Sequence, residues 1–362
     1  MTDSVLRVGL LGFGYASQTF HAPLILSTPG LQLAAVSSSD PARVRAALGD
    51  GVKAWPTADE LIAQADVDLV VIPTPNDTHH PLARAALLAG RHVVVDKPLT
   101  LDAPQAQDLV ALARTQQRLL SVFHNRRWDG DFMTARRLLA DGTLGQVRHA
   151  AFHFDRFRPE VRDRWREADT PGGGLWMDLA PHLIDQCLQL FGWPEALQAD
   201  IARLRPGART DDFFSAQLRY ADGLRVTLGA SMIAAHAGAR FLLQGTRGSY
   251  VKRGLDPQED ALKAGARPDA ARREAWGPDA QAGELTTVGT GDQLTPSELP
   301  TLPGDYLAYY EQLRDAILGR AANPVMPEQA LDVMTLLDLG RRSAADRREH
   351  HTPAPQGYTL SS

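Results

Sequence analysis

Cysteine and lysine are scarce in this sequence. Cys187 is the only cysteine among 362 residues, so no intramolecular disulfide can form, and a reducing compartment is expected. The eleven histidines form no Cys/His cluster with zinc-site spacing, and we predict no metal. Lysine supplies four of the 38 basic side chains, so nearly all positive charge is arginine. Because a partly buried lysine can exchange protons and arginine does not, Lys97, at the end of a run of valines, is a candidate for chemistry.

Long apolar runs and excess basic charge are also missing. No run reaches the roughly 18 apolar residues of a membrane span, and residues 1–4 contain no basic start of a secretory leader. The net charge of -5 gives no reason to expect nucleic acid or an anionic membrane as a partner. We therefore expect a soluble, cytoplasmic protein that acts on a small molecule.

Short apolar runs alternate with helical stretches over the first third of the chain. Strands are predicted at 6–11, 31–37, 68–72, 92–95 and 119–123, with helices between them such as 81–88 and 103–114. Repeating βα units of this length predict a doubly wound parallel sheet of the Rossmann type. The fold class is therefore α/β, with a Rossmann domain over residues 1–123.

The pattern changes after residue 123, where alternating runs are joined by tight turns. These runs predict strands of a mostly antiparallel sheet at 146–158, 197–205, 212–220, 223–233, 239–245 and 248–252. Residues 256–303 are rich in Ala, Gly, Pro and Asp, so we predict a long surface loop with at most one short helix. Helices are expected at 305–319 and 327–346. Residues 124–362 thus form an α+β domain, whose last helix could pack back on the first domain.

A glycine-rich turn follows the first predicted strand. Gly12 and Gly14 fit the first two glycines of the G-x-G-x-x-G fingerprint, and Ser17 replaces the third. The first glycine makes the tight turn, the second lets a pyrophosphate approach the backbone, and the following helix supplies N–H groups. We predict that a dinucleotide binds at Gly12, Phe13, Gly14, Tyr15 and Ala16.

The second strand ends in serines instead of an acid. NAD-binding sheets usually place Asp or Glu there, where it accepts a hydrogen bond from the ribose 2′-OH. This chain has Ser37, Ser38 and Ser39, followed by Arg43, which suits a 2′-phosphate. Asp40 would weaken the argument if the strand ended later than expected. We predict NADP as the cofactor, with NAD as the alternative.

Two more segments end strands at the edge where open α/β sheets bind ligands. From the first we expect cofactor contacts by Pro73, Thr74, Pro75, Asn76 and His79. In the second, three valines are followed by Asp96 and Lys97, which we place at the cofactor and the reacting centre. A lysine at the rim that merely pairs with Asp96 is the alternative.

A third group of candidate residues opens a helix after Gly172-Gly173-Gly174. Asp178 and His182 are four residues apart, so both project from one helical face. A histidine beside a carboxylate is a common arrangement for a general base. In isolation this spacing would more often be a surface pair.

Taken together, the glycine turn, segments 74–76 and 96–98, and the pair Asp178/His182 resemble the glucose–fructose oxidoreductase/inositol dehydrogenase (Gfo/Idh/MocA) family. The resemblance covers essentially the whole chain. It implies a Rossmann domain followed by a substrate-binding domain with an open antiparallel sheet, through which members form homodimers or homotetramers. It also assigns a catalytic role to Lys97, with a Lys–Pro bond that is typically cis. Asp178 becomes the substrate-orienting acid and His182 the proton acceptor.

Segments 123–129, 157–166 and 254–260 look like the subgroup that contains NADP-dependent scyllo-inositol dehydrogenases. Within them, Asn125 is expected in the wall of the cofactor and substrate site. Arg164 and Trp165 are candidates for substrate contact, with an ordered surface loop as the alternative. The arginines at 126 and 127 are expected to form structural ion pairs.

The implied reaction is reversible hydride transfer between nicotinamide and a carbinol carbon of a cyclic polyol. Lys97, Asp178 and His182 are the predicted catalytic residues, and whether Lys97 or His182 accepts the proton stays open. An aldose, a ketose or a deoxy- or anhydro-sugar is the alternative substrate, because relatives with one fold differ in pocket lining. A non-catalytic sensor of NAD(P) or sugar is the remaining alternative, although a sensor has no chemical need for the three catalytic residues.

Overall fold

A computed structural model describes residues 5–358, so the start of the chain, residues 1–4, lies outside the described part. The chain folds into two compact units, each made of several segments. The first contains residues up to Trp128, Pro257–Trp276 and Asp305–Leu331. The second contains Asp129–Asp256, Gly277–Gly304 and the chain from Asp332 onward. The functional domains 1–123 and 124–362 stay a prediction beside this division.

The first unit is built on a six-stranded parallel sheet in the order β3-β2-β1-β4-β5-β6. Its strands are β1 (Leu6–Leu11), β2 (Leu31–Ser37), β3 (Lys53–Trp55), β4 (Leu69–Ile72), β5 (His92–Asp96) and β6 (Leu120–Phe123). Every residue of β4 and β6 is buried, which is typical of strands covered on both faces. The predicted Rossmann topology is confirmed, and β3 is a short strand that the sequence pattern did not indicate.

Side chains cap three of the five helices that lie between the strands of the first unit. These helices are α1 (Ala22–Ser27), preceded by the π-turn η1 (Ser17–His21), α2 (Pro41–Leu48), α3 (Ala58–Gln64), α4 (Asn76–Leu88) and α5 (Ala103–Thr115). The carboxylates or hydroxyl of Asp40, Thr57 and Asp102 each accept the backbone N–H three residues on, which stabilises the start of α2, α3 and α5. Helices α3, α4 and α5 pack side by side, and α1 packs against α9 (Leu307–Ile317).

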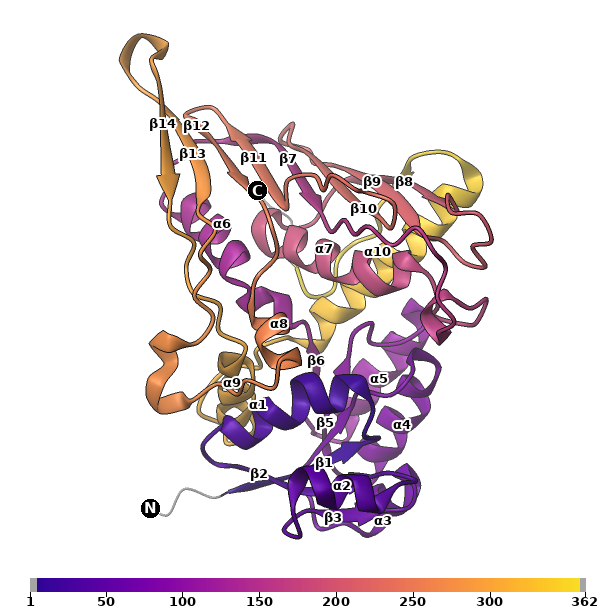
Figure 1. The fold of residues 1–362 in the computed structure, drawn as a ribbon. Coiled ribbons are helices and arrows are strands. Elements are labelled where there is room, and N and C mark those ends of the chain that lie inside the picture. Colours follow the sequence, from indigo (N-terminus) through magenta and orange to yellow (C-terminus); the bar gives the residue numbers. More distant parts are fainter. Residues whose placement is uncertain (1–4, 359–362) are drawn as a thin grey trace. The chain divides into compact units, whose positions relative to one another are not determined.

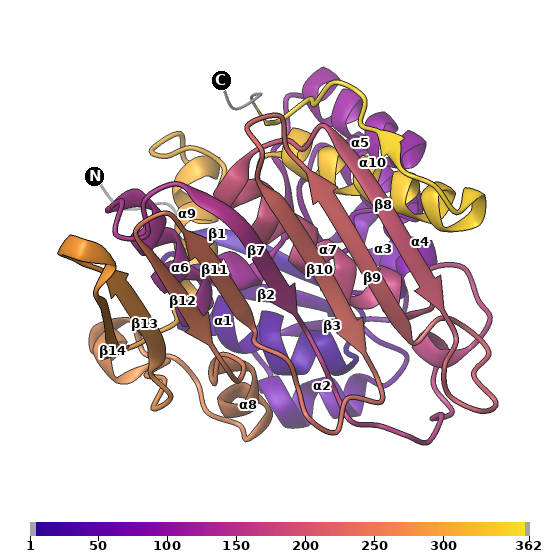
Figure 2. The same ribbon diagram turned by 90° about the horizontal axis from the view of Figure 1, so that it is seen from above.

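The second unit is built on a nine-stranded sheet in the order β14-β13-β12-β11-β7-β10-β9-β8-β15 (Figure 2). Its first strands are β7 (Val147–His153), β8 (Ala196–Ala202), β9 (Phe213–Arg219), β10 (Arg225–Ser231), β11 (Phe241–Gly245) and β12 (Gly248–Lys252). All neighbours are antiparallel except β7 and β10. These strands confirm the predicted, mostly antiparallel sheet, and the parallel pair makes it a mixed one.

Helices line one face of this sheet (Figure 1). They are α6 (Gly130–Ala140), α7 (Leu175–Phe191) and the part of α10 (Pro327–Asp346) that belongs to the second unit. Helices α7 and α10 meet closely because Gly340 has no side chain, and a Cβ there would lie 2.2 Å from the ring of Trp176. The Trp176 indole N–H donates to the carbonyl of Leu337 at 3.1 Å. This contact fixes the start of α7, where the predicted catalytic pair lies.

The predicted surface loop over 256–303 is wrong in its second half. Residues 283–299 form a hairpin of β13 (Gly283–Val288) and β14 (Leu294–Leu299), which extends the sheet and projects beyond its other strands (Figure 2). Five of the six β14 residues are exposed, so no inward apolar stripe marks the strand in the sequence. Pro296 is tolerated because β14 is an edge strand.

The first half of that segment contributes to the first unit. It forms α8 (Gln258–Lys263) and the short 3-10 helix η4 (Ala270–Ala275), next to η2 (Asn125–Trp128) and α9 in the same unit. The second unit has further short elements, η3 (Trp165–Glu167), η5 (Thr290–Asp292) and β15 (His350–His351). Among residues 5–358, none of the helices has the length and apolar character needed to cross a membrane.

Candidate active site

The glycine turn after β1 has the geometry of a phosphate-binding turn. Gly12 has a φ of +78°, a conformation that glycine adopts without strain. Its N–H donates to the Ser37 hydroxyl at 2.9 Å, and its carbonyl accepts from the Ser17 hydroxyl at 2.8 Å. Ser17 therefore stabilises the turn from the third fingerprint position. A Cβ built on Gly14 meets no atom within 4 Å, so the space beside this residue is open to a ligand.

The end of β2 carries no carboxylate that is positioned for a ribose. The strand ends at Ser37, and the Asp40 carboxylate accepts the Arg43 N–H at 3.0 Å as the cap of α2. Ser38 accepts the Asp40 N–H at 3.1 Å in the same tight turn. Ser39 and the Arg43 side chain are exposed. Serine and arginine side chains thus lie at this edge, and the Asp40 carboxylate is engaged in capping.

The ends of β4 and β5 are tied together by a fully buried histidine. His79 has one ring nitrogen 2.9 Å from the Thr74 carbonyl and the other 2.8 Å from the Pro98 carbonyl. Burial lowers the pKa of His79, against the opposing effect of the Asp96 carboxylate. Asn76, also buried, is the first residue of α4. His79 thus positions the two segments predicted to meet the cofactor, and its own ring is not exposed.

Lys97 follows β5 in a turn whose Lys97–Pro98 bond is cis, as expected. The Asp96 carboxylate accepts the Lys97 backbone N–H at 2.8 Å. His21 lies behind it, with Nε2 3.8 Å from the other Asp96 oxygen and Nδ1 2.6 Å from the Tyr310 hydroxyl. Burial would raise the pKa of the Asp96 carboxyl, but His21 and Lys97 outweigh burial and hold it below its usual range. Asp96 therefore stays anionic at neutral pH.

Asn125 is the first residue of η2, two residues after the end of β6, and it is almost fully buried. The two arginines that follow are structural. Arg126 forms a 2.5 Å ion pair with Glu259, which confirms the expectation for this residue. Arg127 donates to the Gln329 amide oxygen at 3.0 Å.

The predicted pair Asp178/His182 lies in the first two turns of α7 in the second unit. Gly174, with a φ of +96°, begins the helix, and a Cβ at this position would collide with the Asp211 carboxylate. Asp211 accepts the Trp176 N–H at 2.6 Å and so caps α7 from a distant loop. His182 is buried, with its ring stacked on Phe154 at a centroid distance of 6.5 Å.

The segment 156–167 brings arginines to Asp178. Arg166 Nε lies 3.4 Å from the Asp178 carboxylate, and its guanidinium covers the ring of Trp165 at 4.4 Å. Arg164 instead donates to Glu167 at 2.7 Å, so its guanidinium serves at least in part to order the loop. Arg164 and Trp165, the predicted substrate contacts, therefore directly precede Arg166, which the sequence analysis did not single out.

Glu167 anchors this segment through buried charges. Arg205 donates to Glu167 and to Asp212, both at 2.9 Å, and all three side chains are buried. Arg205 also donates to the carbonyls of Arg158 and Glu160. The Arg205 guanidinium thus donates four hydrogen bonds that hold the loop beside Asp178.

Arg158 is the one member of this arginine-rich segment with an unusual charge balance. Burial and repulsion from Arg156 lower the pKa of the Arg158 guanidinium, and Arg164 and Arg162 add to the repulsion. Asp178 acts in the opposite direction. Within the described residues Arg158 forms no ion pair. The surroundings of Asp178 are therefore strongly positive.

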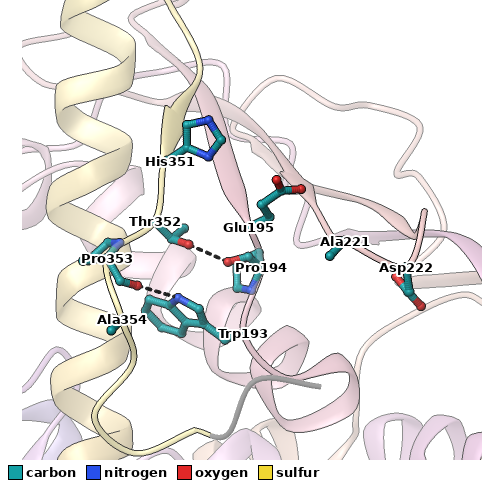
Figure 3. A pocket seen from close by; sticks show the side chains of 9 residues that line it. All are labelled: Trp193, Pro194, Glu195, Ala221, Asp222, His351, Thr352, Pro353 and Ala354. Carbon is teal, nitrogen blue, oxygen red and sulfur yellow. Dashed lines mark hydrogen bonds between the residues drawn. The ribbon is translucent and has the colours of Figure 1, made fainter. Parts of the chain in front are cut away.

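A shallow pocket of about 340 Å³ lies elsewhere in the second unit, at the β8/β15 edge of the sheet (Figure 3). Thr352 donates to the Pro194 carbonyl and the Trp193 indole donates to the Pro353 carbonyl across it. None of the predicted site residues lines this pocket. We do not assign it to the reaction.

Both halves of the chain match one protein family. Residues 6–124 match the Gfo/Idh/MocA oxidoreductase family, NAD-binding Rossmann fold, and residues 136–352 match its C-terminal alpha/beta domain. The chain belongs to the Gfo/Idh/MocA family. Its members' assignment as oxidoreductases makes this protein an NAD(P)-dependent enzyme that acts on CH–OH groups.

Individual relatives of the Gfo/Idh/MocA family cover nearly the whole chain. An uncharacterized oxidoreductase of Escherichia coli, YdgJ, is 53% identical over 96% of this chain and 98% of its own. The scyllo-inositol 2-dehydrogenase (NADP(+)) IolW of Bacillus subtilis is 34% identical over 95% of each chain. The solved structure of an oxidoreductase from Yersinia pestis is 51% identical, with a TM-score of 0.91 over 98% of this chain and 99% of that one.

Several residues around the site escaped the sequence analysis. His21 and Tyr310 lie behind Asp96, Asp211 caps α7, and Arg158 and Arg166 face Asp178. The density of arginine in 156–166 was a visible signal for the last two. His21, Tyr310 and Asp211 come from segments remote in sequence, and no local pattern marks them.

Proposed function

We propose that the protein is an NADP-dependent dehydrogenase of a cyclic polyol, with scyllo-inositol as the foremost substrate. In the reverse direction it would reduce the corresponding inosose. The observation that carries the proposal is the buried His182 one helical turn after the ion-paired Asp178, in a chain similar throughout to IolW. The capping role of Asp40 and the exposed Arg43 support NADP over NAD.

When bound, the nicotinamide would supply the acceptor for the hydride of the carbinol carbon. His182 takes the hydroxyl proton, so that the C–H and O–H bonds break and a ketone forms. Lys97 donates a hydrogen bond to the same oxygen and stabilises the charge that develops on it, an effect worth several kcal/mol in other enzymes. Asp178 holds a neighbouring hydroxyl and orients the imidazole of His182.

The cofactor would be held by the turn and strand ends of the first unit. We assign the phosphates to Gly12, Phe13, Gly14, Tyr15 and Ala16, and the 2′-phosphate to Ser38, Ser39 and Arg43, with Ser37 supporting the turn. The nicotinamide half would contact Pro73, Thr74, Pro75, Asn76, Asp96, Lys97 and Asn125. His79 would act through the Thr74 and Pro98 carbonyls that it contacts.

Initial rates of nicotinamide absorbance change test this proposal. NADP and then NAD are assayed with scyllo-inositol, myo-inositol and a set of aldoses. Turnover of scyllo-inositol with NADP, at a kcat/KM at least tenfold above that with NAD, is the expected result. Turnover of an aldose alone would keep the mechanism and replace the substrate. No turnover with any polyol or sugar, by protein that binds NADPH, would contradict the proposal.

A second candidate substrate is a polyol or sugar that carries a carboxylate. The half-buried Arg158, surrounded by arginines and without an ion pair in the described part of the chain, favours an anionic group near Asp178. Adding an aldonate and a uronate to the assay distinguishes the two. For an acidic substrate, Arg158→Gln would raise KM by about tenfold or more, because a charged hydrogen bond is lost. For scyllo-inositol the same change would leave KM within about threefold.

We also propose that the protein forms a homodimer or homotetramer through the face of the nine-stranded sheet opposite α7. That face carries small and polar side chains such as Thr227 and Ser249, which are only partly exposed within one chain. Light scattering on the purified protein would give the mass of the assembly.

A further inference from the structure

Helix α8 reaches the first unit from far along the chain. It follows β12 of the second unit, yet residues 257–276 belong to the first unit. Gln258, which is fully buried, fixes its start through three hydrogen bonds. The Gln258 side chain donates to the Trp128 carbonyl at 3.1 Å and accepts from the Trp276 indole at 2.9 Å and the Tyr306 N–H at 2.7 Å. These buried hydrogen bonds therefore fix the position of the start of α8 within the first unit.

The helix lies against the phosphate-binding turn. α8 packs on η1, the segment that follows the glycine turn and continues into α1 (Figure 1). Burial would lower the pKa of Lys263, the last residue of α8, but Glu259, Asp260 and, to a smaller extent, Tyr15 raise it. Tyr15 directly follows Gly14, and its side chain is 56% exposed. Lys263 is therefore the last residue of a helix that packs on the segment directly after the glycine turn.

Lys263 has two carboxylate partners, one of which it shares with Arg126. Glu259 contacts both Arg126, at 2.5 Å, and Lys263, at 2.8 Å. Arg126 is buried and Glu259 is half-buried, and the carboxyl pKa of Glu259 falls to about 2 because Arg126 and Lys263 outweigh the effect of burial. The second partner of Lys263 is Asp260, at 3.0 Å, whose side chain is 85% exposed. Exposed pairs of this kind contribute little and exchange readily.

We propose that α8 is the outer wall of the dinucleotide site and that Lys263 binds the diphosphate of the cofactor. On binding, the Lys263 ammonium exchanges its contact with Asp260 for a phosphate oxygen, while Arg126 continues to neutralise Glu259. Helix α8, in the first half of segment 256–303, would thus help to retain the cofactor. The inference rests on the NADP binding proposed above and is independent of the polyol.

Three probes separate the diphosphate from the rest of the cofactor. ADP-ribose has the diphosphate without the 2′-phosphate, adenosine 2′-monophosphate has the reverse, and NADPH has both. Their dissociation constants are measured by calorimetry or nucleotide fluorescence for the wild type, Lys263→Gln and Arg43→Gln. Loss of one charge-assisted hydrogen bond is expected to weaken binding by about tenfold. Lys263→Gln should weaken ADP-ribose and NADPH by this factor and leave the monophosphate within twofold.

Arg43→Gln is the matched control, because it should weaken the monophosphate and NADPH and leave ADP-ribose unchanged. Lys263→Arg keeps the charge and should restore most of the affinity for ADP-ribose. Unchanged ADP-ribose binding in Lys263→Gln would overturn the proposal, as would an equal loss for all three probes, which indicates a distorted site. These outcomes need no substrate, so the failure of the polyol assignment would be seen separately. Wild-type protein that binds ADP-ribose but not the monophosphate would contradict NADP and leave the role of Lys263 standing.

Discussion

The two units hold their functional side chains by different means. In the first unit, side chains bind the backbone of neighbouring strand ends, as Ser37 does at Gly12 and His79 does at the Pro98 carbonyl. In the second unit, the predicted acid Asp178 is paired with Arg166, and the loop that carries this arginine depends on the buried Glu167. Backbone contacts follow from the strand order. Ion pairs depend on the charge of every partner.

The comparison predicts that changes in the first unit alter binding or turnover and that changes in the second also alter folding. The largest effect is expected for Lys97→Ala. Removing a donor to the reacting oxygen should lower kcat by about 10²–10³-fold. The dissociation constant for NADPH should stay within twofold, because Asp96 contacts the Lys97 backbone, which the variant keeps. Single-turnover rates and NADPH fluorescence measure the two quantities, and normal turnover would refute the role of Lys97.

Asp178→Asn is expected to lower kcat by about 10²-fold, since the amide no longer stabilises a protonated His182. It also removes the carboxylate from an arginine-rich setting, so Arg166 loses its ion partner. We therefore expect a lower melting temperature as well, which distinguishes this variant from Lys97→Ala. Equal melting temperatures for the two variants would contradict the expectation that changes in the second unit also affect folding.

Much of the fold was predictable because local patterns encode it. The buried valine run of β5 and the glycine turn after β1 show in the sequence, and so do the alternating strands from β7 to β12. The hairpin 283–299 was missed because its strands pair through the backbone with few buried side chains. The candidate site divides in the same way. Motifs marked Lys97 and His182, whereas Tyr310 is brought to His21 by tertiary packing that no local pattern reports.

The stability of each unit should depend on pH, because each contains an ion-paired carboxylate whose pKa is lowered. The pKa of Glu167 is lowered, because the Arg162 N–H, Arg164 and Arg205 outweigh burial. A carboxyl group whose pKa is lower in the folded state contributes stability above its unfolded value, near 4.5, and loses it as the pH falls through the folded value. For Glu259 in the first unit this loss extends down to about pH 2.

Glu167→Gln should therefore lower the free energy of unfolding by about 3 kcal/mol at pH 7, because it leaves Arg205 buried with one charged partner fewer. The difference from the wild type should shrink as the pH falls below 4.5, where the carboxyl group of the unfolded state takes up a proton, and should continue to shrink until the pH passes the lower pKa of the folded state. Urea unfolding between pH 3 and 7 measures both quantities. A difference that stays constant with pH would show that Glu167 acts through packing and not through its charge.

The smallest effect is expected for Ser37→Ala in the first unit. The variant removes the oxygen that accepts the Gly12 N–H and leaves the buried end of β2 otherwise unchanged. Loss of one neutral hydrogen bond costs about 1 kcal/mol, which corresponds to roughly fivefold in an equilibrium constant. Because this bond sets the shape of the phosphate-binding turn, the loss should appear as weaker binding of NADPH and ADP-ribose alike, with kcat at saturating cofactor unchanged. Ser39→Ala is the matched control, because we assign its exposed hydroxyl to the 2′-phosphate, and it should weaken NADPH but not ADP-ribose. If both variants weakened NADPH alone, Ser37 would act on the 2′-phosphate directly, and the turn would not depend on its hydroxyl.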